Sequence, residues 1–346
     1  MATYYVESGH GGSDAGTAAN PWLTIDQAMN AVGAGDKVWV KASVDYTELV
    51  TIDTAGAANT PIVFEGYTTA TGDGGRATIT GSGARTSCIT DSIGADTDIF
   101  YVFKNFRMTD ATGSGFDSDC DHITFKNCKF DTNGTHGCVT RISVHESCEY
   151  MGNTSSGLEL GGSAVVVGST FYSNLVGLGA SGISFTVLGC TFFSNSQWGI
   201  AMGSGGGSSQ VVANCVIDGD GKDTDIGIRI SNDLAVLGIL NTVVYDCTTG
   251  ISAGGGDMGE RIVSRNNCVN ANTANYVDIE TFTGEVTAAP DFVDEVAGAD
   301  YTPNTGSPLV AAGYDLGPDM DIGAIQVTAG GGGGGLLMPN KRAGKQ

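Results

Sequence analysis

Basic residues are scarce in this chain. It carries 16 lysines and arginines against 38 aspartates and glutamates, which gives a formal net charge of -22. Nucleic acids and anionic membrane surfaces bind to basic patches, so this balance excludes both as expected partners. An acidic flank also repels an acidic polymer, which disfavours the degradation of polyuronates. Neutral glycans, cationic partners and divalent cations are the ligand classes that the charge allows.

Long apolar runs and the features of a secretory signal are missing too. No apolar stretch has the length of a membrane span, and Met1 to Tyr5 lack a basic start and an apolar core. Nine cysteines are an odd number and none forms a CxxC pair, so we do not expect a disulfide framework. We expect synthesis in a cytoplasm without a signal peptide.

The sequence does contain a repeat. Between Phe100 and Asn270 a corner residue, a second residue that is most often cysteine, and a short apolar stretch recur every 20 to 27 residues. Self-similarity with such a period is typical of solenoids. The corner positions are Asn105, Asn127, Ser147, Gly168, Gly189, Asn214, Asn241 and Asn267.

A second column pairs glycine with a following apolar residue. Its glycines are Gly157, Gly177, Gly199, Gly227 and Gly250. Between the two columns stands Asn or Asp, residue types that tolerate the left-handed conformation of a sharp corner. These residues are Asn133, Asn153, Asn174, Asn195 and Asp220.

The short runs between these corners indicate strands and not helices. They alternate apolar and polar residues and are rich in β-branched and aromatic side chains. With 54 glycines in the chain, a helical repeat would lose about 1 kcal/mol per helical glycine. The pattern therefore predicts an all-β coil of parallel strands, wound from one chain, in which each turn pairs with the next.

In this pattern the chain resembles the right-handed parallel β-helix proteins, the group that includes pectate lyases and many phage spikes. The resemblance covers Tyr4 to Gln326 and implies one solenoid domain, residues 45–327. An N-terminal cap, residues 1–44, precedes it, with Thr24 as the N-cap of a helix whose apolar face includes Ile25 and Met29. A tail, residues 328–346, follows. Since β-helix spikes are often trimers, the resemblance makes a homotrimer possible.

The cysteine column provides a test of this fold. If successive turns stack in register, its thiols point inward at one level and pack as small hydrophobes. The spacing is that of the turn, which favours this core role over metal binding or redox chemistry. The predicted core ladder is Cys128, Cys148, Cys190, Cys215 and Cys268.

The C-terminal tail differs in composition from the rest. Six consecutive glycines, Gly330 to Gly335, form a flexible tether, and a short apolar and basic peptide follows. We interpret this peptide as a tag that docks into a groove on a larger assembly such as a capsid; a frayed terminus or an expression remnant is the alternative. The docking residues would be Leu336, Leu337, Met338, Pro339, Lys341, Arg342 and Lys345.

The densest acidic cluster is a candidate for chemistry. On a strand, Asp117, Asp119 and Asp121 would share one face, where they could form a general acid/base set or a calcium site. Counting one turn onward places Arg141 over Asp119, so a solvated strand with one ion pair is the alternative.

A second acidic run lies at a lengthened corner. Alternating Asp and Gly at Asp218, Asp220, Asp223 and Asp225 offers oxygen ligands on a tight turn, as calcium loops require. The EF-hand pattern fails because Lys222 replaces a ligand. Arg229, near Asp223 and Asp225, is a candidate base.

Four other polar or aromatic positions have plainer interpretations. His136, His145 and Glu146 show no metal-ligand spacing and are expected to decorate the surface. Trp198 could stack on a sugar, but we expect it to cover a corner of the coil.

Three functions follow from these observations. The first is a non-enzymatic structural protein on a virion surface, of the phage decoration or spike type, held by its tail. The second is a polysaccharide lyase or glycoside hydrolase using Asp117, Asp119, Asp121 and Arg229, and the third is an adhesin that binds glycans. The resemblance to pectate lyases implies a basic residue beside calcium-binding carboxylates, so calcium is a possible ligand although no cofactor is required. The Asn-Thr-Asp and paired-Asp motifs of polygalacturonases are absent.

Overall fold

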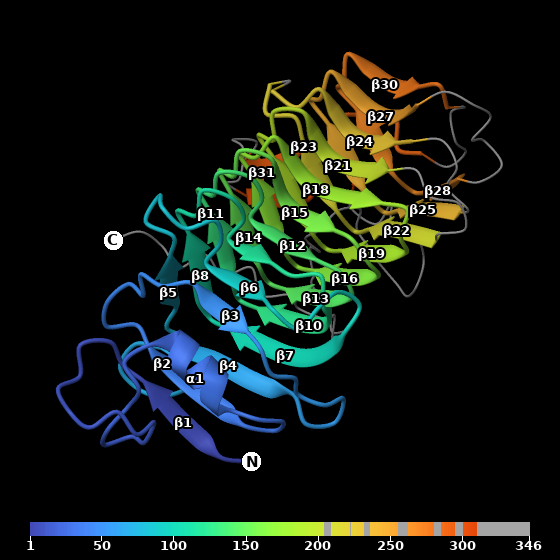
Figure 1. Cartoon of the computed structure of the whole chain (residues 1–346). Coiled ribbons are helices and arrows are strands. Elements are labelled where there is room, and N and C mark those ends of the chain that lie inside the picture. Colours follow the sequence, from blue (N-terminus) through green and yellow to red (C-terminus); the bar gives the residue numbers. More distant parts are fainter. Residues whose placement is uncertain are drawn as a thin grey trace. The chain divides into compact units, whose positions relative to one another are not determined.

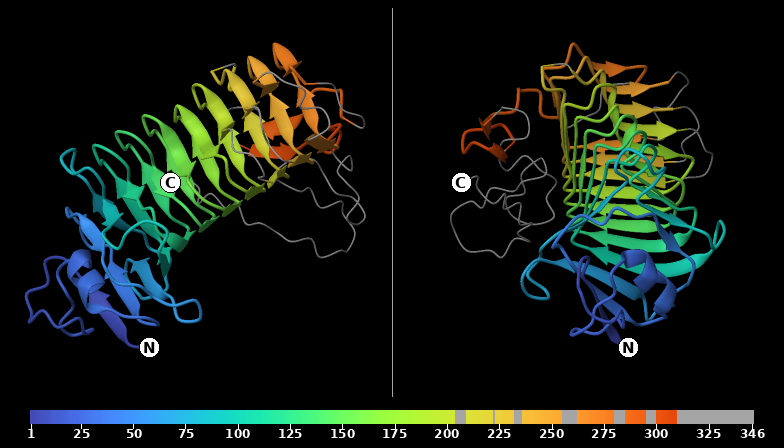
Figure 2. Two further views of the ribbon diagram at one scale, coloured as in Figure 1. Left: turned by 45° about the vertical axis from the view of Figure 1, so that its right-hand side comes forward. Right: turned by 60° about the vertical axis from the view of Figure 1, so that its left-hand side comes forward.

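The chain folds as a right-handed parallel β-helix of about nine turns. The computed structural model describes residues 1–203, 209–221, 223–231, 236–254, 262–279, 285–294 and 300–309. Two compact units make up the chain: one contains residues 1–165 and 169–185, and the other contains residues 166–168 and 186–346. In each unit, strands of successive turns lie side by side (Figures 1 and 2).

Three parallel sheets, here named A, B and C, form the walls of the first unit. Sheet A contains β1 (Thr3–Val6), β2 (Lys37–Lys41), β4 (Ile62–Tyr67), β7 (Asp98–Lys104), β10 (Asp121–Lys126) and β13 (Ser143–Glu146). Sheet B contains β5 (Ala77–Thr80), β8 (Phe106–Thr109), β11 (Lys129–Asp131), β14 (Glu149–Met151) and β17 (Thr170–Tyr172). Sheet C contains β3 (Val50–Ile52), β6 (Ile89–Asp91), β9 (Phe116–Asp117), β12 (Cys138–Thr140), β15 (Ser156–Leu160) and β18 (Val176–Ser181).

The second unit repeats this arrangement. Sheet A contains β22 (Ser209–Ala213), β25 (Val236–Leu240) and β28 (Ile262–Arg265). Sheet B contains β20 (Thr191–Phe193), β23 (Val216–Asp218), β26 (Val243–Tyr245) and β29 (Cys268–Asn270). Sheet C contains β21 (Trp198–Gly203), β24 (Ile226–Ile230), β27 (Thr249–Ala253) and β30 (Ala274–Val277). β31 (Phe292–Asp294) and β32 (Asp300–Pro303) form an antiparallel pair, and β16 (Ala164–Val167) and β19 (Phe185–Leu188) contribute residues to both units.

The alternation in the sequence produces the core. In β7 the side chains of Ile99, Tyr101 and Phe103 are buried while their neighbours are more exposed. Because parallel strands stack without offset, equivalent rings lie over one another. Phe130 and Tyr150 have ring centroids 5.1 Å apart with planes 5° from parallel, which is an offset stack of the kind that aromatic pairs prefer.

The predicted helix is confirmed. α1 (Ile25–Ala31) begins after Thr24, whose hydroxyl accepts a hydrogen bond from the backbone N–H of Gln27 at 3.1 Å. Ile25 and Met29 are fully buried. The helix packs against β1 and β3 at the N-terminal end of the first unit (Figure 1).

The cysteine ladder is confirmed for four of its five members. The nine cysteines are buried and none of them forms a disulfide. The Sγ atoms of Cys128, Cys148, Cys190 and Cys215 each lie 3.3–3.5 Å from the carbonyl oxygen two residues earlier. Ser169 continues the column in the first unit, where its hydroxyl accepts from the N–H of Cys148 at 3.1 Å.

The fifth member, Cys268, was assigned wrongly. β29 pairs with β26 so that Cys268 stands beside Val243, and Asn267 occupies the ladder position beside Thr242. There the side-chain oxygen of Asn267 accepts from the N–H of Thr242 at 2.8 Å. Cys268 is still buried, but it lies one residue past the column.

The asparagine column also has a role different from the predicted one. The left-handed residues are those just before the asparagines, such as Thr132 (φ 60°), Gly152 (φ 63°) and Ser173 (φ 56°). The asparagines are buried: the side-chain oxygen of Asn153 accepts from both the N–H and the amide of Asn133, at 3.1 and 3.0 Å. Only Asp220, with φ 48°, is left-handed itself.

Several predictions concern residues outside the described ranges. The glycine tether and the docking residues Leu336 to Lys345 are among them, as is Lys222. Among the helices that the structure describes, none has the length and apolar character needed to cross a membrane.

Candidate functional site

The acidic residues predicted to act together lie at a corner of the first unit. Asp117 ends β9 in sheet C, Asp121 begins β10 in sheet A, and Asp119 lies in the turn between them. The prediction that all three share one face of a strand is therefore wrong. Three more aspartates lie at the same corner one turn earlier: Asp91, Asp96 and Asp98. The carboxylate of Asp91 accepts a hydrogen bond from the backbone N–H of Asp119 at 3.1 Å. Asp98 is the register partner of Asp121 where β7 and β10 pair. We call these six aspartates the acidic corner.

Arg141 binds this corner, but not through the predicted residue. Its guanidinium forms an ion pair with Asp96 and lies 3.4 Å from Asp121 Oδ1, because the chain bends between sheets C and A. Asp121 is 8 % exposed and also accepts from the N–H of Ile142 at 3.3 Å. Asp121 is thus a buried, partnered residue, and Asp117 and Asp119 remain exposed.

The carboxyl of Asp117 has a raised pKa, although part of the side chain faces solvent. Desolvation by the packed chain around it raises the pKa of its carboxyl, and the charges of Asp119 and Asp91 raise it further, against a smaller opposing effect of His136. A carboxyl with a raised pKa keeps its proton closer to neutral pH, as general acids require.

A second carboxyl stands in the same row of sheet C. Asp117 pairs with Val139 and Val139 pairs with Glu159, so the two acidic residues lie two strands apart on the outer face. Strands are spaced about 4.8 Å apart, which separates the two backbones by about 9.5 Å. The Ser156 hydroxyl donates to Glu159 Oε2 at 2.9 Å and fixes that oxygen as an acceptor. Sequence reasoning missed Glu159, although its spacing from Asp117 equals two turns of the repeat.

The backbone at the acidic corner is irregular. The register between β7 and β10 shifts between Asp121 and Ile123, so a bulge interrupts the ladder. At this bulge Phe100 and His122 have φ of 48° and 65°, the left-handed region that a bulky residue rarely adopts. Bulges are frequent beside active sites, where they redirect side chains.

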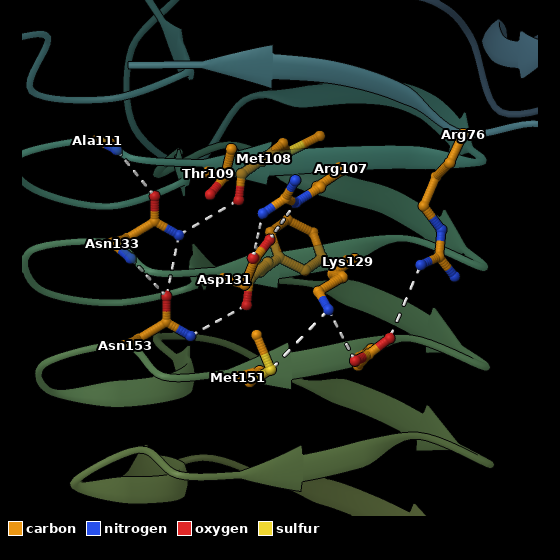
Figure 3. Close-up of polar contacts among 12 residues, drawn as sticks. Arg76, Arg107, Met108, Thr109, Ala111, Lys129, Asp131, Asn133, Met151 and Asn153 are labelled. Carbon is orange, nitrogen blue, oxygen red and sulfur yellow. Dashed lines mark hydrogen bonds and ion pairs between the residues drawn. The ribbon is translucent and has the colours of Figure 1, made fainter. Parts of the chain in front are cut away.

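A basic cluster on the outer face of sheet B is a second candidate site that sequence reasoning missed (Figure 3). Arg107 donates two hydrogen bonds, of 2.8 and 2.6 Å, to Asp131, whose side chain is 1 % exposed. Lys129 lies 3.0 Å from Glu149, and Arg76 lies 3.8 Å from the other oxygen of that carboxylate. The cations thus surround carboxylates of their own chain.

Glu149 is the most contacted member of this cluster. Burial pushes its pKa upward, but the hydroxyl of Tyr172, which donates at 2.5 Å, and the ammonium of Lys129 outweigh this effect. The pKa of Glu149 therefore lies below its ordinary value, and the side chain is held as a carboxylate.

The aspartates predicted to form a calcium loop lie in the second unit. Asp218 is 3 % exposed; its carboxylate accepts from the Tyr301 hydroxyl at 2.6 Å and from the N–H of Asp220 at 2.8 Å. Asp223 and Asp225 are exposed. No group of three or more His, Cys, Asp or Glu side chains in the described part of the chain is placed to hold a metal ion, and calcium binding by this acidic run stays a prediction.

Arg229 and Trp198 stack on each other in the second unit. The guanidinium lies 4.3 Å from the ring centroid of Trp198, and within the described residues it forms no ion pair with Asp223 or Asp225. A cation–π contact explains the position of both side chains, which agrees with the expectation that Trp198 covers a corner.

His145 is buried, so its assignment to the surface was wrong. It stands in β13 beneath Phe125, with Nδ1 2.6 Å from the Tyr150 hydroxyl and Nε2 3.0 Å from the Ser143 hydroxyl. Desolvation lowers its pKa to about 3, so the imidazole is neutral in the core. His136 is half-buried, and Glu146 is exposed and paired with Lys126 at 2.6 Å.

Comparisons with known proteins match the fold and not the sequence. No family model and no curated protein matches the chain, but 27 chains of solved structures do. The structure is similar to pectate lyase Pel9A, with 18 % identity, a TM-score of 0.59, and coverage of 94 % of this chain and 96 % of the other. It is also similar to an alginate lyase from Paenibacillus sp. str. FPU-7, with 13 % identity, a TM-score of 0.56, and coverage of 74 % and 96 %.

A third similar structure is described as a rhamnogalacturonan lyase, with 12 % identity, a TM-score of 0.55, and coverage of 85 % of this chain and 91 % of the other. At such identities the likeness shows the fold alone. The resemblance to phage proteins finds no support in these comparisons, whereas the resemblance to pectate lyases is confirmed. The chain has the right-handed parallel β-helix fold of the pectate-lyase-like proteins.

Proposed function

We propose that the protein cleaves the glycosidic bonds of a polysaccharide that lies across the outer face of sheet C in the first unit. The observation that carries this proposal is the row formed by Asp117, Val139 and Glu159. Its first member has a raised pKa, and its last is a carboxyl held by Ser156.

The spacing of this row suits hydrolysis with inversion better than hydrolysis with retention. Inverting glycosidases place an acid and a base roughly 6.5–9.5 Å apart, which leaves room for a water molecule, whereas retaining enzymes need about 5 Å. The strand spacing gives about 9.5 Å between the two backbones. The Glu159 carboxylate itself lies over Gly179, its partner in β18, on the side away from Asp117.

In this reaction Asp117 donates its proton to the glycosidic oxygen as the bond from that oxygen to the anomeric carbon breaks. Glu159 accepts a proton from water, whose oxygen forms the new bond to the same carbon. Atoms and charges balance: the proton lost by Asp117 leaves with one sugar, and Glu159 gains one from water. A second proton exchange with solvent restores both groups.

The similar structures support a polysaccharide as substrate. Pectate, alginate and rhamnogalacturonan lyases, by their names, all act on polysaccharides. Elimination from a uronate needs a positive charge to neutralise the sugar carboxylate, and Arg141 is already paired with two aspartates. Hydrolysis therefore fits the acidic corner better than elimination does.

Elimination at the basic cluster is a second candidate. Lys129 and Tyr172 both contact Glu149, and an amine or phenol is a usual base for proton abstraction. Every cation of the cluster is paired with a carboxylate, and Lys129 and Arg76 share Glu149, which leaves less positive charge for a substrate. We therefore rank it second.

We prefer the enzyme hypothesis to the hypothesis of a virion surface protein. None of the similar structures named above is a viral or purely structural protein. The tail on which that hypothesis relied lies outside the described residues.

Release of reducing ends from a panel of neutral and acidic polysaccharides tests the proposal. We expect Asp117→Asn and Glu159→Gln each to lower the rate by 100-fold or more, while Glu146→Gln, a control carboxylate exposed on sheet A, keeps full activity. Proton NMR of the first product should show an inverted anomer. A glycan that binds without any release of reducing ends by the wild type would make the protein an adhesin and refute the proposal.

A further inference from the structure

A pair of stacked rings stands beside the acidic corner and takes no part in the reaction above. The rings of Phe100 and His122 lie 4.7 Å apart with planes 7° from parallel. His122 Nε2 is 3.2 Å from Asp98 Oδ1, and the side chains of His122 and Asp98 are 40 % and 60 % exposed. Partners thus fix the imidazole on one face and at one nitrogen, while much of its surface faces solvent.

The backbone under this pair is strained. Residues in the left-handed region other than glycine cost about 1–3 kcal/mol each, and Phe100 and His122 both occupy it at the bulge between β7 and β10. Neither residue is needed to fill the core, because Ile99 and Ile123 do so at the same level. The alternation of β7 and β10 directs both rings outward, and the bulge sets how they lie beside each other.

The chemistry of the exposed atoms is that of hydrogen-bond acceptors. When Nε2–H donates to Asp98, the other ring nitrogen, Nδ1, carries a lone pair, and among the described residues it has no partner. The second carboxylate oxygen of Asp98 is likewise unpartnered there. His122 Nδ1 and the second oxygen of Asp98 are thus two hydrogen-bond acceptors beside an apolar ring face. A sugar matches them, because it carries hydroxyl donors on neighbouring carbons and has apolar C–H faces.

We propose that Phe100, His122 and Asp98 form a binding subsite for a neutral glycan. His122 Nδ1 and Asp98 accept hydrogen bonds from two adjacent hydroxyls, and one face of the sugar rests against the ring pair. This inference rests on the proposed function and names its substrate class. A uronate would bring its carboxylate against Asp96, Asp98 and Asp119, in a chain with a net charge of -22, which costs binding energy through like-charge repulsion.

Isothermal titration calorimetry with defined hexasaccharides tests the subsite. The probes are the β-1,4-linked hexamers of glucose, xylose and mannose, together with hexagalacturonate. We expect at least one neutral hexamer to bind more tightly than hexagalacturonate, and His122→Ala to weaken that binding about tenfold, the effect of one lost hydrogen bond. Asp98→Asn and Phe100→Leu should each weaken it several-fold.

Lys126→Ala is the matched control, since Lys126 lies on the same strand and is paired with Glu146; its affinity should equal that of the wild type. Tighter binding of hexagalacturonate than of every neutral hexamer would overturn the inference, as would unchanged affinity in both His122→Ala and Asp98→Asn. If His122→Ala fails to fold, Asp98→Asn and Phe100→Leu decide the question.

The two proposals fail in different ways. If Asp117→Asn abolishes cleavage while both His122→Ala and Asp98→Asn bind normally, the subsite is wrong and the enzyme stands. If the wild type binds a neutral hexamer through His122 and releases no product from any glycan, the subsite stands and the enzyme is wrong.

Discussion

The two units put the same residue type to opposite uses. In the first unit, Asp117 is exposed on a sheet face near other aspartates, and its pKa is raised. In the second unit, the pKa of Asp218 is also raised by burial, but Tyr301 and the backbone of Asp220 occupy its oxygens. A raised pKa therefore does not identify a catalytic group by itself. Access to a ligand separates the two aspartates.

The largest expected effect is a difference in glycan cleavage between variants of Asp117 and Asp218. Asp117→Asn should reduce glycan cleavage by 100-fold or more, because the amide has no proton to donate to a leaving group. Asp218→Asn should leave the rate within about twofold of the wild type, because Asp218 is enclosed by its own chain. Initial rates of reducing-end release measure both, and a large loss in Asp218→Asn would erase the contrast between the units.

A second contrast concerns two arginines on sheet faces. Arg107→Met removes both hydrogen bonds that Arg107 donates to the buried carboxylate of Asp131. It should lower the free energy of unfolding by about 3 kcal/mol. This is the lower end of the range for a broken buried ion pair, because the Arg107 side chain is 41 % exposed. Arg229→Met loses only a stack on Trp198, worth about 0.5–1 kcal/mol. Urea unfolding measures both. Equal losses would mean that Asp131 finds other partners.

A third contrast concerns two histidines of the first unit. The pKa of His145 is about 3 in the fold and about 6.5 in an unfolded chain. The unfolded state then binds more protons between these values, so stability falls as the pH drops below 6.5. The loss should be about 2 kcal/mol between pH 7 and pH 5.

His145→Gln should remove that dependence, whatever its effect on stability at pH 7, while His136→Gln should retain it. Denaturant titrations at pH 7, 6 and 5 compare the slopes. A wild-type slope that survives in His145→Gln would place the titrating group elsewhere.

The smallest expected effect is on the stability of variants at Asp218 and Asp225. Asp218→Asn replaces one acceptor of the Tyr301 hydroxyl and should cost about 1 kcal/mol of unfolding free energy. Asp225→Asn, on an exposed side chain, should cost nothing measurable. Thermal unfolding of the two variants is sufficient. A larger loss in Asp225→Asn would show that this aspartate has a partner.

Much of the fold was predictable because its signals are local. Alternating strands, a capped helix at Thr24 and a cysteine that recurs in several turns each follow from a few adjacent residues. The error at Cys268 arose because alignment by residue type matched a cysteine to the cysteine column, whereas hydrogen bonding placed Asn267 there. Both residues can occupy the site, so sequence similarity could not decide the register.

The site was less predictable because it depends on the path of the chain between strands. The run from Asp117 to Asp121 alternates like a strand, yet the coil turns within it. Glu159 is 42 residues from Asp117 in the sequence and becomes its neighbour only through the strand register. His145 was placed on the surface because of its polarity, although the alternation of β13 directs it inward.

The asparagine column has a consequence for how such a protein can change in length. In the first unit, the amide oxygen of each of Asn133, Asn153 and Asn174 accepts from the residue one turn earlier. A deletion or duplication of one whole coil joins identical donors to identical acceptors and leaves no polar group unpaired. A change of a few residues breaks that match. The length of this β-helix is therefore expected to change by complete coils.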